Sequence, residues 1–287
     1  MAALWMILAS FFFACMGVCV KLGAERFGTA ELTFYRGAIG VVVMAALMLA
    51  SGTAFRTPYW RRQLSRGVAG TVSLACYFFA ISILPLATAV TLNYTSPLFV
   101  ALMLAIGFRE HLPRQALVAL GVGFVGVVVL LRPTLASDQW LGAIAGLGTG
   151  LIASLAYIHV RELGRLGEAE TRTVFYFSCL TALATLPFVL AGGGFTVPDG
   201  RGALMLAGVG GFGAAAQLAM TRAYRYGTTI VAANLAYSTV VFASLFGMLV
   251  WQETLTSMAV VGMLLIVASG VLVSLARHGA KAPARVN

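Results

Sequence analysis

Two amide side chains stand near tyrosines at related places in the two halves of the chain. Asn93 directly precedes Tyr94, and Asn234 comes three residues before Tyr237. An amide both donates and accepts hydrogen bonds, and a tyrosine adds an aromatic face and a hydroxyl. These groups suit a small solute that carries a carboxylate or an amine. The alternative interpretation is structural, with amides bonded between helices and tyrosines in an interfacial belt.

Arg36 is the only arginine clearly inside an apolar run. We favour the interpretation that it snorkels to the outer surface. The alternatives are that it holds a substrate carboxylate or pairs with Glu31 one turn earlier. The other candidate solute-binding side chains lie in further apolar runs: Tyr77, Tyr157, Tyr176 and Gln217.

The composition places these residues in a membrane protein. Apolar residues make up 60% of the chain and charged residues 10%, with a mean hydropathy of +0.94. A soluble domain carries roughly 25% charged residues. The net charge of +10 arises from basic residues between the apolar runs, so it indicates membrane topology rather than nucleic-acid binding.

Ten apolar runs approach the ~20 residues that a bilayer-spanning helix needs. The predicted spans are Ala2–Val20, Leu32–Ala50, Gly67–Leu84, Thr88–Gly107, Gln115–Leu131, Leu141–Val160, Thr173–Ala191, Gly202–Thr221, Thr229–Val250 and Ser257–Ala276. Their connections are too short for separate soluble domains. We therefore predict an all-α integral membrane protein of ten transmembrane helices.

The basic residues predict the orientation, because Lys and Arg are enriched in cytoplasmic loops. With both termini in the cytoplasm, the inner side holds Arg56, Arg61, Arg62, Arg66, Arg109, Arg114, Arg161, Arg165, Arg172, Arg222, Arg225, Arg277, Lys281 and Arg285. The outer side keeps Lys21, Arg26, Arg36, Arg132 and Arg201.

A repeated motif links the fourth and ninth runs. Tyr94-Thr-Ser-Pro-Leu-Phe99 leads to Arg109-Glu110-His-Leu112, and Tyr237-Ser-Thr-Val-Val-Phe242 leads to Gln252-Glu253-Thr-Leu255. Tyr, Phe, Glu and Leu recur at one offset. The motif predicts two five-helix repeats, residues 1–135 and 136–287.

An odd number of spans obliges the second repeat to enter the membrane upside down. Glu110 and Glu253 then lie on opposite sides, where we expect each to cap a helix or to pair with a nearby arginine such as Arg109. Inverted repeats place a binding site near the midplane, which predicts transport. Val240 replaces Pro97, so we expect no counterpart in the ninth run to a proline break in the fourth.

The repeated motif, together with Phe34-Tyr35-Arg36 in the second run, resembles the EamA-type drug/metabolite transporters. The resemblance covers essentially the whole chain. It implies a cavity lined by spans one to four and six to nine, with spans five and ten peripheral. Members include exporters of amino acids and related metabolites and uptake systems for vitamins.

We therefore expect a secondary transporter of a bacterial-type inner membrane that exports amino acids or related metabolites by alternating access. Uptake of a vitamin or nucleobase-like solute is the alternative. A non-transporting scaffold or a membrane enzyme is the competing class, although no catalytic group can be assembled from the sequence.

Two glycine patterns, Gly121–Gly126 and Gly208–Gly213, fit the dinucleotide-binding motif G-x-G-x-x-G. Both lie inside apolar runs, where small residues let helices approach closely. The expected partners are a small-molecule substrate and the lipid bilayer, with a candidate homodimer contact through the fifth and tenth spans. No nucleic acid, cofactor or metal is expected.

Overall fold

The computed structural model of the chain describes residues 2–84, 86–131, 139–252 and 256–279. All regular secondary structure in these ranges is α-helical. The helices are α1 (Ala2–Gly23), α2 (Thr29–Ala50), α3 (Trp60–Ile83), α4 (Leu86–Asn93), α5 (Ser96–Ile106), α6 (Arg114–Leu131), α7 (Trp140–Arg165), α8 (Glu170–Ala191), α9 (Gly200–Tyr226), α10 (Thr229–Leu235), α11 (Ser238–Trp251) and α12 (Ser257–Gly279).

Eight helical stretches of the described chain are long and apolar enough to cross a membrane. They are α1, α2, α6, α7, α8 and α9, with Ala89–Ile106 and Thr229–Trp251. The apolar part of α12, Ser257–Val273, is shorter, and α3 begins with a basic turn that contains Arg61 and Arg62. The all-helical membrane architecture is confirmed, and the count of ten spans stays a prediction.

Two of these stretches bend at related positions. The backbone amide of Thr95 bonds the carbonyl of Leu92 at 3.1 Å, and the amide of Tyr237 bonds the carbonyl of Asn234 at 3.1 Å. These bonds span three residues, as in a 3₁₀ turn, and they separate α4 from α5 and α10 from α11.

The expectation that the ninth run lacks this break is wrong. Pro97 lies at the start of α5, where its missing N–H breaks no helical bond. Each bend packs instead against a glycine of another helix. A Cβ on Gly150 of α7 would overlap the hydroxyl of Thr95, and a Cβ on Gly123 of α6 would lie 2.6 Å from the ring of Tyr237. The bends therefore fit local packing rather than proline.

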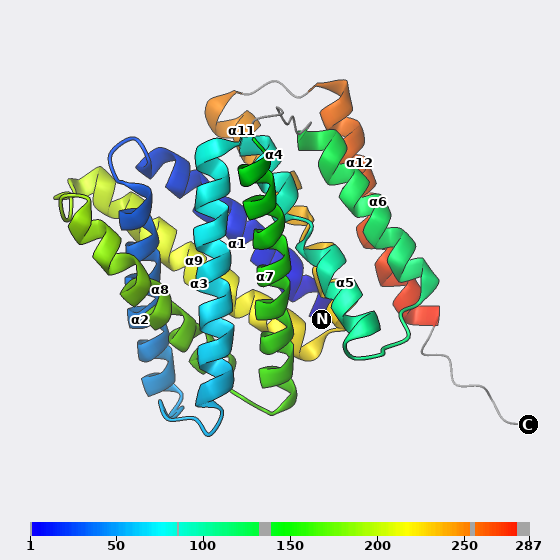
Figure 1. Cartoon of the computed structure of the whole chain (residues 1–287), viewed down its shortest axis with the longest axis horizontal. Helices are drawn as coiled ribbons and strands as arrows, with labels where there is room; N and C mark the ends of the chain where they lie inside the picture. The colour runs from blue at the N-terminus through cyan, green and yellow to red at the C-terminus, as the bar shows by residue number, and fades with distance from the viewer. Residues whose placement is uncertain (1, 85, 132–138, 253–255, 280–287) are drawn as a thin grey trace, which may run out of the picture.

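Helices from the first half of the chain pack on helices from the second. The extensive pairs are α1 with α9, α2 with α8, α3 with α7 and α6 with α12 (Figure 1). In the view of Figure 1, α2 and α8 lie on the left, α3 and α7 stand side by side in front, and α6 and α12 form the right edge. The two halves thus bury their contact surfaces against each other.

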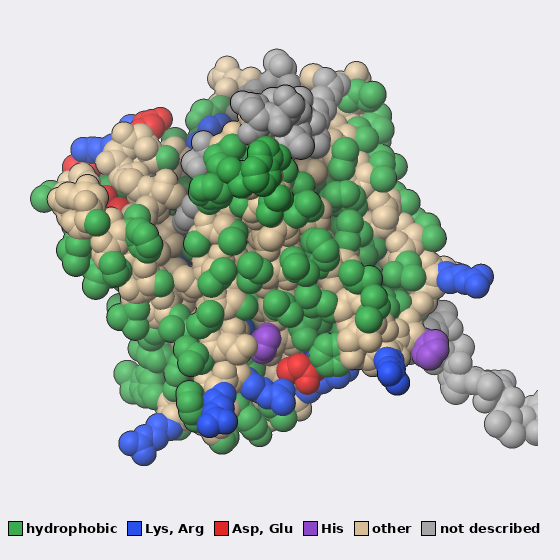
Figure 2. Space-filling view, in the orientation of Figure 1, with side chains coloured by type: hydrophobic (Ala, Val, Ile, Leu, Met, Phe, Trp, Pro, Cys, Tyr) green, Lys and Arg blue, Asp and Glu red, His purple; other side chains and the backbone are tan. Residues whose placement is uncertain are grey.

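The surface agrees with a lipid environment. In Figure 2, hydrophobic side chains spread over the middle of this face, and charged side chains gather along the lower edge and at the upper left. Large apolar residues such as Leu204 and Leu249 are exposed on the helices. An apolar band between charged ends is the pattern that a bilayer requires.

The glycine patterns serve helix packing, as predicted. A Cβ on Gly126 of α6 would lie 2.8 Å from the carbonyl oxygen of Gly262 of α12, and a Cβ on Gly210 of α9 would overlap the side chain of Ile39. Side chains at these positions would push the helices apart. Gly126 thus packs against α12 of the same chain. A homodimer contact through these helices stays a prediction.

We expect Gly126→Leu to destabilise the protein by about 1–3 kcal/mol, because the new side chain must displace the backbone of α12. The measurement is the midpoint of thermal unfolding in detergent. Gly121→Leu is the matched control, since a Cβ there meets nothing within 4 Å. Equal midpoints for the two variants would contradict the proposed role of this contact.

Candidate functional site

Two arginines from neighbouring helices approach one aromatic ring in the interior. The guanidinium carbon of Arg66, on α3, lies 3.8 Å from the ring centre of Phe177 on α8. The corresponding distance for Arg36, on α2, is 5.8 Å. Arg66 is only 3% exposed. Both distances fall within the range of cation–π attraction. We call Arg36 and Arg66 the arginine pair.

The hydrogen bonds of Arg66 are incomplete. Its Nη2 donates to Oε1 of Gln217, on α9, at 3.2 Å. Its Nε and Nη1 are buried and have no hydrogen-bond partner. A Cβ on Gly70, one turn along α3, would lie 2.9 Å from Nη1, so this glycine leaves room for the guanidinium. Buried charged donors without partners are costly, which makes them candidates for a ligand.

A cavity of about 10 Å³, room for about one water molecule, lies beside the arginine pair, so a metabolite fits there only after the helices around it move apart. It is lined by Arg36, Gly37, Phe177, Ser178, Thr181, Gly213, Ala214 and Gln217. The hydroxyl oxygen of Thr181 is buried there without a partner. The cavity therefore combines positive charge, an aromatic ring and unsatisfied polar atoms.

The arginine pair has no counter-charge in the described part of the chain. The ion pairs found there use Arg26, Arg62, Arg161, Arg165, Arg172 and Arg225. Taking an unpaired charge out of water costs several kcal/mol, so the buried Arg66 beside the partly buried Arg36 attracts an anion strongly. The chemistry that this arrangement supports is the binding of a carboxylate or a similar anion.

The structure changes the interpretation of both arginines. Arg36 does not snorkel or pair with Glu31, because it turns toward Phe177 and the cavity, while Glu31 bonds Thr196 on the α8–α9 connection. The prediction that Arg66 lies in a cytoplasmic loop is wrong, because α3 begins at Trp60 and carries this residue inward. The feature of the sequence that indicates an inward-facing Arg66 is Gly70, which follows it by one helical turn and leaves room for its long side chain.

Four tyrosines form a second group beside the arginine pair. The rings of Tyr94 and Tyr237 are 6.2 Å apart, and those of Tyr157 and Tyr224 stack at 5.4 Å with an interplanar angle of 15°. All four belong to one hydrophobic core. Tyr157 is close enough to both arginines to interact with them electrostatically. The structure thus brings together three predicted tyrosines and adds Tyr224, which the sequence analysis missed.

The two predicted amides have different surroundings. Asn234 is 1% exposed and accepts a hydrogen bond from Ser269 of α12 at 3.4 Å. Its Nδ2 and the hydroxyl of the neighbouring Tyr237 are buried without partners. Asn93 is partly buried at the end of α4. Asn234 thus contacts the α12 side of the fold, and its free donor is available to a solute or to a water molecule.

The remaining predicted tyrosines lie apart from the arginine pair. Tyr77 packs with Ala80 and Leu84 near the end of α3. Tyr176 donates a hydrogen bond to the carbonyl of Phe55, on the α2–α3 connection, at 3.2 Å. Tyr176 therefore helps to attach a connection between helices and does not join the group around Tyr157.

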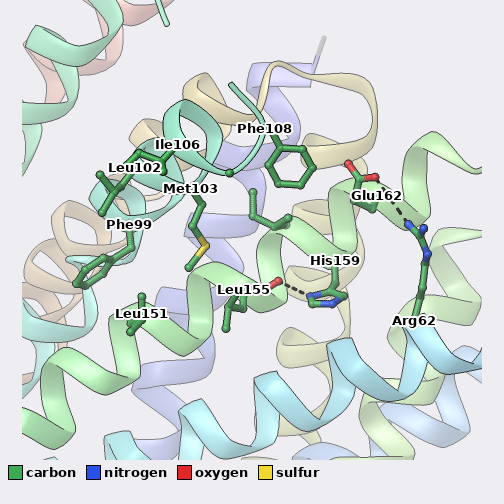
Figure 3. A pocket seen from close by; sticks show the side chains of 12 residues that line it. Arg62, Phe99, Leu102, Met103, Ile106, Phe108, Leu151, Leu155, His159 and Glu162 are labelled. Carbon is green, nitrogen blue, oxygen red and sulfur yellow. Dashed lines mark hydrogen bonds and ion pairs between the residues drawn. The ribbon is translucent and has the colours of Figure 1, made fainter. Parts of the chain in front are cut away.

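A larger groove of about 680 Å³ opens between α3, α5 and α7. Figure 3 shows Phe99, Leu102, Met103 and Ile106 on one wall and Leu151, Leu155 and His159 on the other. Leu102 and Ile106 are exposed, so the groove opens sideways on the apolar surface. Its lining provides few polar partners, and it is therefore a weaker candidate for a charged solute than the cavity beside the arginine pair.

Comparison with known proteins identifies the family. The model of the EamA-like transporter family matches residues 1–132 and 140–275. The chain belongs to the EamA-like transporter family. It is a multi-pass membrane protein of a family of small-molecule transporters.

Two relatives of this EamA-like transporter are named for the solutes that they carry. The chain is 32% identical to the pseudopaline exporter CntI of Pseudomonas aeruginosa, over 95% of each chain. It is 27% identical to a riboflavin transporter of Vibrio cholerae, over 77% of this chain and 75% of that protein. A solved crystal structure with 21% identity matches with a TM-score of 0.86 over 98% of this chain and 99% of the other, which shows a shared fold.

A chain of ion pairs connects the two halves of this EamA-like transporter at one end. Arg62 of α3 lies 3.7 Å from Glu162 of α7, and Arg165 lies 3.5 Å from both Glu162 and Glu110. Arg161, whose side chain is 5% exposed, also pairs with Glu110 on the α5–α6 connection. The expectation that Glu110 caps a helix or pairs with its neighbour Arg109 is not met, because its carboxylate pairs with Arg161 and Arg165 of the other half.

We expect Glu110→Gln to destabilise the protein by about 1–3 kcal/mol, because it leaves the buried guanidinium of Arg161 without a counter-charge. Thermal unfolding in detergent measures the effect. Arg165→Gln removes a half-exposed partner of the same carboxylate and should cost less than about 1 kcal/mol. A larger loss for Arg165→Gln than for Glu110→Gln would contradict this account.

Proposed function

We propose that this EamA-like transporter exports amino acids or related small metabolites across the inner membrane by alternating access. The observation that carries the proposal is the cavity beside the arginine pair, which lies between helices of the two halves. The 32% identity to an exporter along 95% of both chains supports the direction of transport.

The pairing of helices supports an inverted duplication. If α1, α2, α3 and α6 correspond to α7, α8, α9 and α12, exchanging the halves turns the α1–α9 pair into the α7–α3 pair. The α2–α8 and α6–α12 pairs map onto themselves. The two family matches, residues 1–132 and 140–275, agree with the proposed repeats 1–135 and 136–287. Such duplication places a solute site between halves that rock.

The position of the cavity fits this motion. Arg36 and Arg66 come from the first half, whereas Phe177 and Gln217 come from the second. A solute between them touches both moving parts, so binding can be linked to their relative position. In this proposal the ion pairs around Glu110, which join the two halves at one end, break when the halves separate there.

We include the tyrosine group and the two amides in the proposed solute path. Tyr94, Tyr157 and Tyr237 share one core between the halves, and Tyr157 is the member that lies near the arginine pair. Their rings can contact the apolar part of a metabolite while the arginines hold its charged part. Asn93 is the last residue of α4 and Asn234 is the last but one of α10, so both amides lie at the bends of their stretches.

Uptake of a ring-bearing vitamin is the second candidate function. The stacked pair Tyr157–Tyr224 favours it, because an aromatic face of this kind can stack on the flat ring of a solute. Three relatives with identities from 24% to 27% are riboflavin transporters.

Flux in proteoliposomes tests the proposal. The protein is reconstituted into liposomes, which are then loaded with labelled L-leucine, L-glutamate or riboflavin. Efflux of the label is measured with and without a pH gradient. Efflux of an amino acid well above that of protein-free liposomes is the expected result. Flux of riboflavin alone would support the second candidate, and no flux of any solute would overturn both.

We expect Asn93→Ala and Asn234→Ala each to lower amino-acid flux several-fold while normal amounts of protein reach the membrane. Removing an amide that contacts the solute weakens its binding in one access direction. Gln115→Ala, which removes an exposed amide from α6, is the control. Unchanged flux in both asparagine variants would remove these amides from the solute path.

A further inference from the structure

We propose that the arginine pair makes this carrier selective for acidic metabolites, in which carboxylates outnumber amines, and that Arg66 and Arg36 each hold one carboxylate. This inference rests on the proposed export function and names its substrate class. The juxtaposition that carries it is two guanidiniums around Phe177 with no counter-charge in the described part of the chain.

The free donors of Arg66 define the first contact. Gln217 uses only Nη2, which leaves Nε and Nη1 pointing from both edges of a guanidinium that is 3% exposed. A carboxylate supplies two acceptor oxygens and a negative charge, so it satisfies these donors better than a neutral group.

Arg36 defines the second contact. Its guanidinium faces the same ring and lines the small cavity, with Gly213 beside its side chain. A solute with one carboxylate and one ammonium group can neutralise one arginine only. Its ammonium then meets a second cation, and no described acidic residue pairs with either arginine. A solute with two carboxylates neutralises both arginines, so this repulsion does not arise.

The rest of the lining favours an acid over a base. Ser178 and Thr181 add hydroxyls, and that of Thr181 is buried without a partner and can donate to a carboxylate oxygen. The face of Phe177 is already approached by both guanidiniums, so it is not free to receive an ammonium group. A basic solute therefore finds no favourable contact for its charge.

A structural role for Arg66 makes a different prediction about stability. If Arg66 mainly supports the fold, replacing it should lower the unfolding temperature. If it is held as an unpaired charge for a ligand, replacing it should raise the unfolding temperature of the empty protein, because the repulsion and the unsatisfied donors disappear. The two roles therefore predict shifts of opposite sign.

The first experiment measures binding by thermal unfolding in lipid nanodiscs with succinate, L-glutamate, L-leucine, L-lysine or sodium chloride as probes. Wild-type protein should be stabilised by succinate and glutamate more than by leucine, and not by lysine or chloride. Arg66→Gln should unfold at a higher temperature when empty and lose the shift with succinate. Arg201→Gln, at the exposed start of α9, is the matched control and should behave as wild type.

The second experiment places a carboxylate beside Arg66 within the protein. Gln217→Glu keeps an oxygen in reach of Nη2 and adds the missing negative charge. It should stabilise the empty protein and weaken the apparent affinity for succinate at least about tenfold, because the new carboxylate competes with the solute. Arg66→Lys should retain part of the selectivity, since it keeps the charge but loses the fork of donors.

The outcomes separate this inference from the proposed function. Leucine flux in proteoliposomes equal to or faster than glutamate flux would leave export standing and overturn the selectivity. An equal thermal shift with chloride and with succinate would assign the site to an inorganic anion. A lower unfolding temperature of empty Arg66→Gln with an unchanged succinate shift would assign Arg66 a structural role. If no solute moves but succinate still binds through Arg66, the export function fails and the acid site remains.

Discussion

The packing of each first-half helix on a second-half helix is the interaction on which the rest of this structure depends. The pairs α1–α9, α2–α8 and α3–α7 surround the place where the arginine pair, Phe177 and Gln217 meet. Small residues at these contacts let the backbones approach closely, and van der Waals packing then replaces the hydrophobic effect that lipid cannot provide. Polar side chains can stay inside because helices on every side shield them from lipid.

The same interface collects many of the interior's unsatisfied polar atoms. Arg66, Thr181, Asn234 and Tyr237 each carry a buried nitrogen or oxygen without a partner. Native proteins leave few such atoms, and each one lowers stability. Their concentration between the halves is consistent with a site that gives up stability in order to accept a ligand.

The sequence predicted most of the helices and singled out Tyr94, Tyr157 and Tyr237, which the fold brings into one core, because apolar runs and a repeated motif are local signals. It misplaced Arg66, because a charged residue at the edge of an apolar run looks the same whether it faces water or turns inward. It also misjudged Glu110, whose partners Arg161 and Arg165 lie on α7 and can be identified only once the fold is known. The bend before α11 was missed for a similar reason, since it packs on Gly123 of another helix.

The character of α3 has a consequence for biosynthesis. Its basic first turn and Arg66 make it a poor candidate to enter lipid alone, and it is absent from the stretches that qualify by length and hydropathy. The groups that shelter Arg66 belong to α8 and α9, and Gln217 lies 151 residues further along the chain. Because a lone arginine in lipid is costly, we expect the guanidinium to stay near water or lipid headgroups until those helices are made. The first half would then mature together with the second rather than before it.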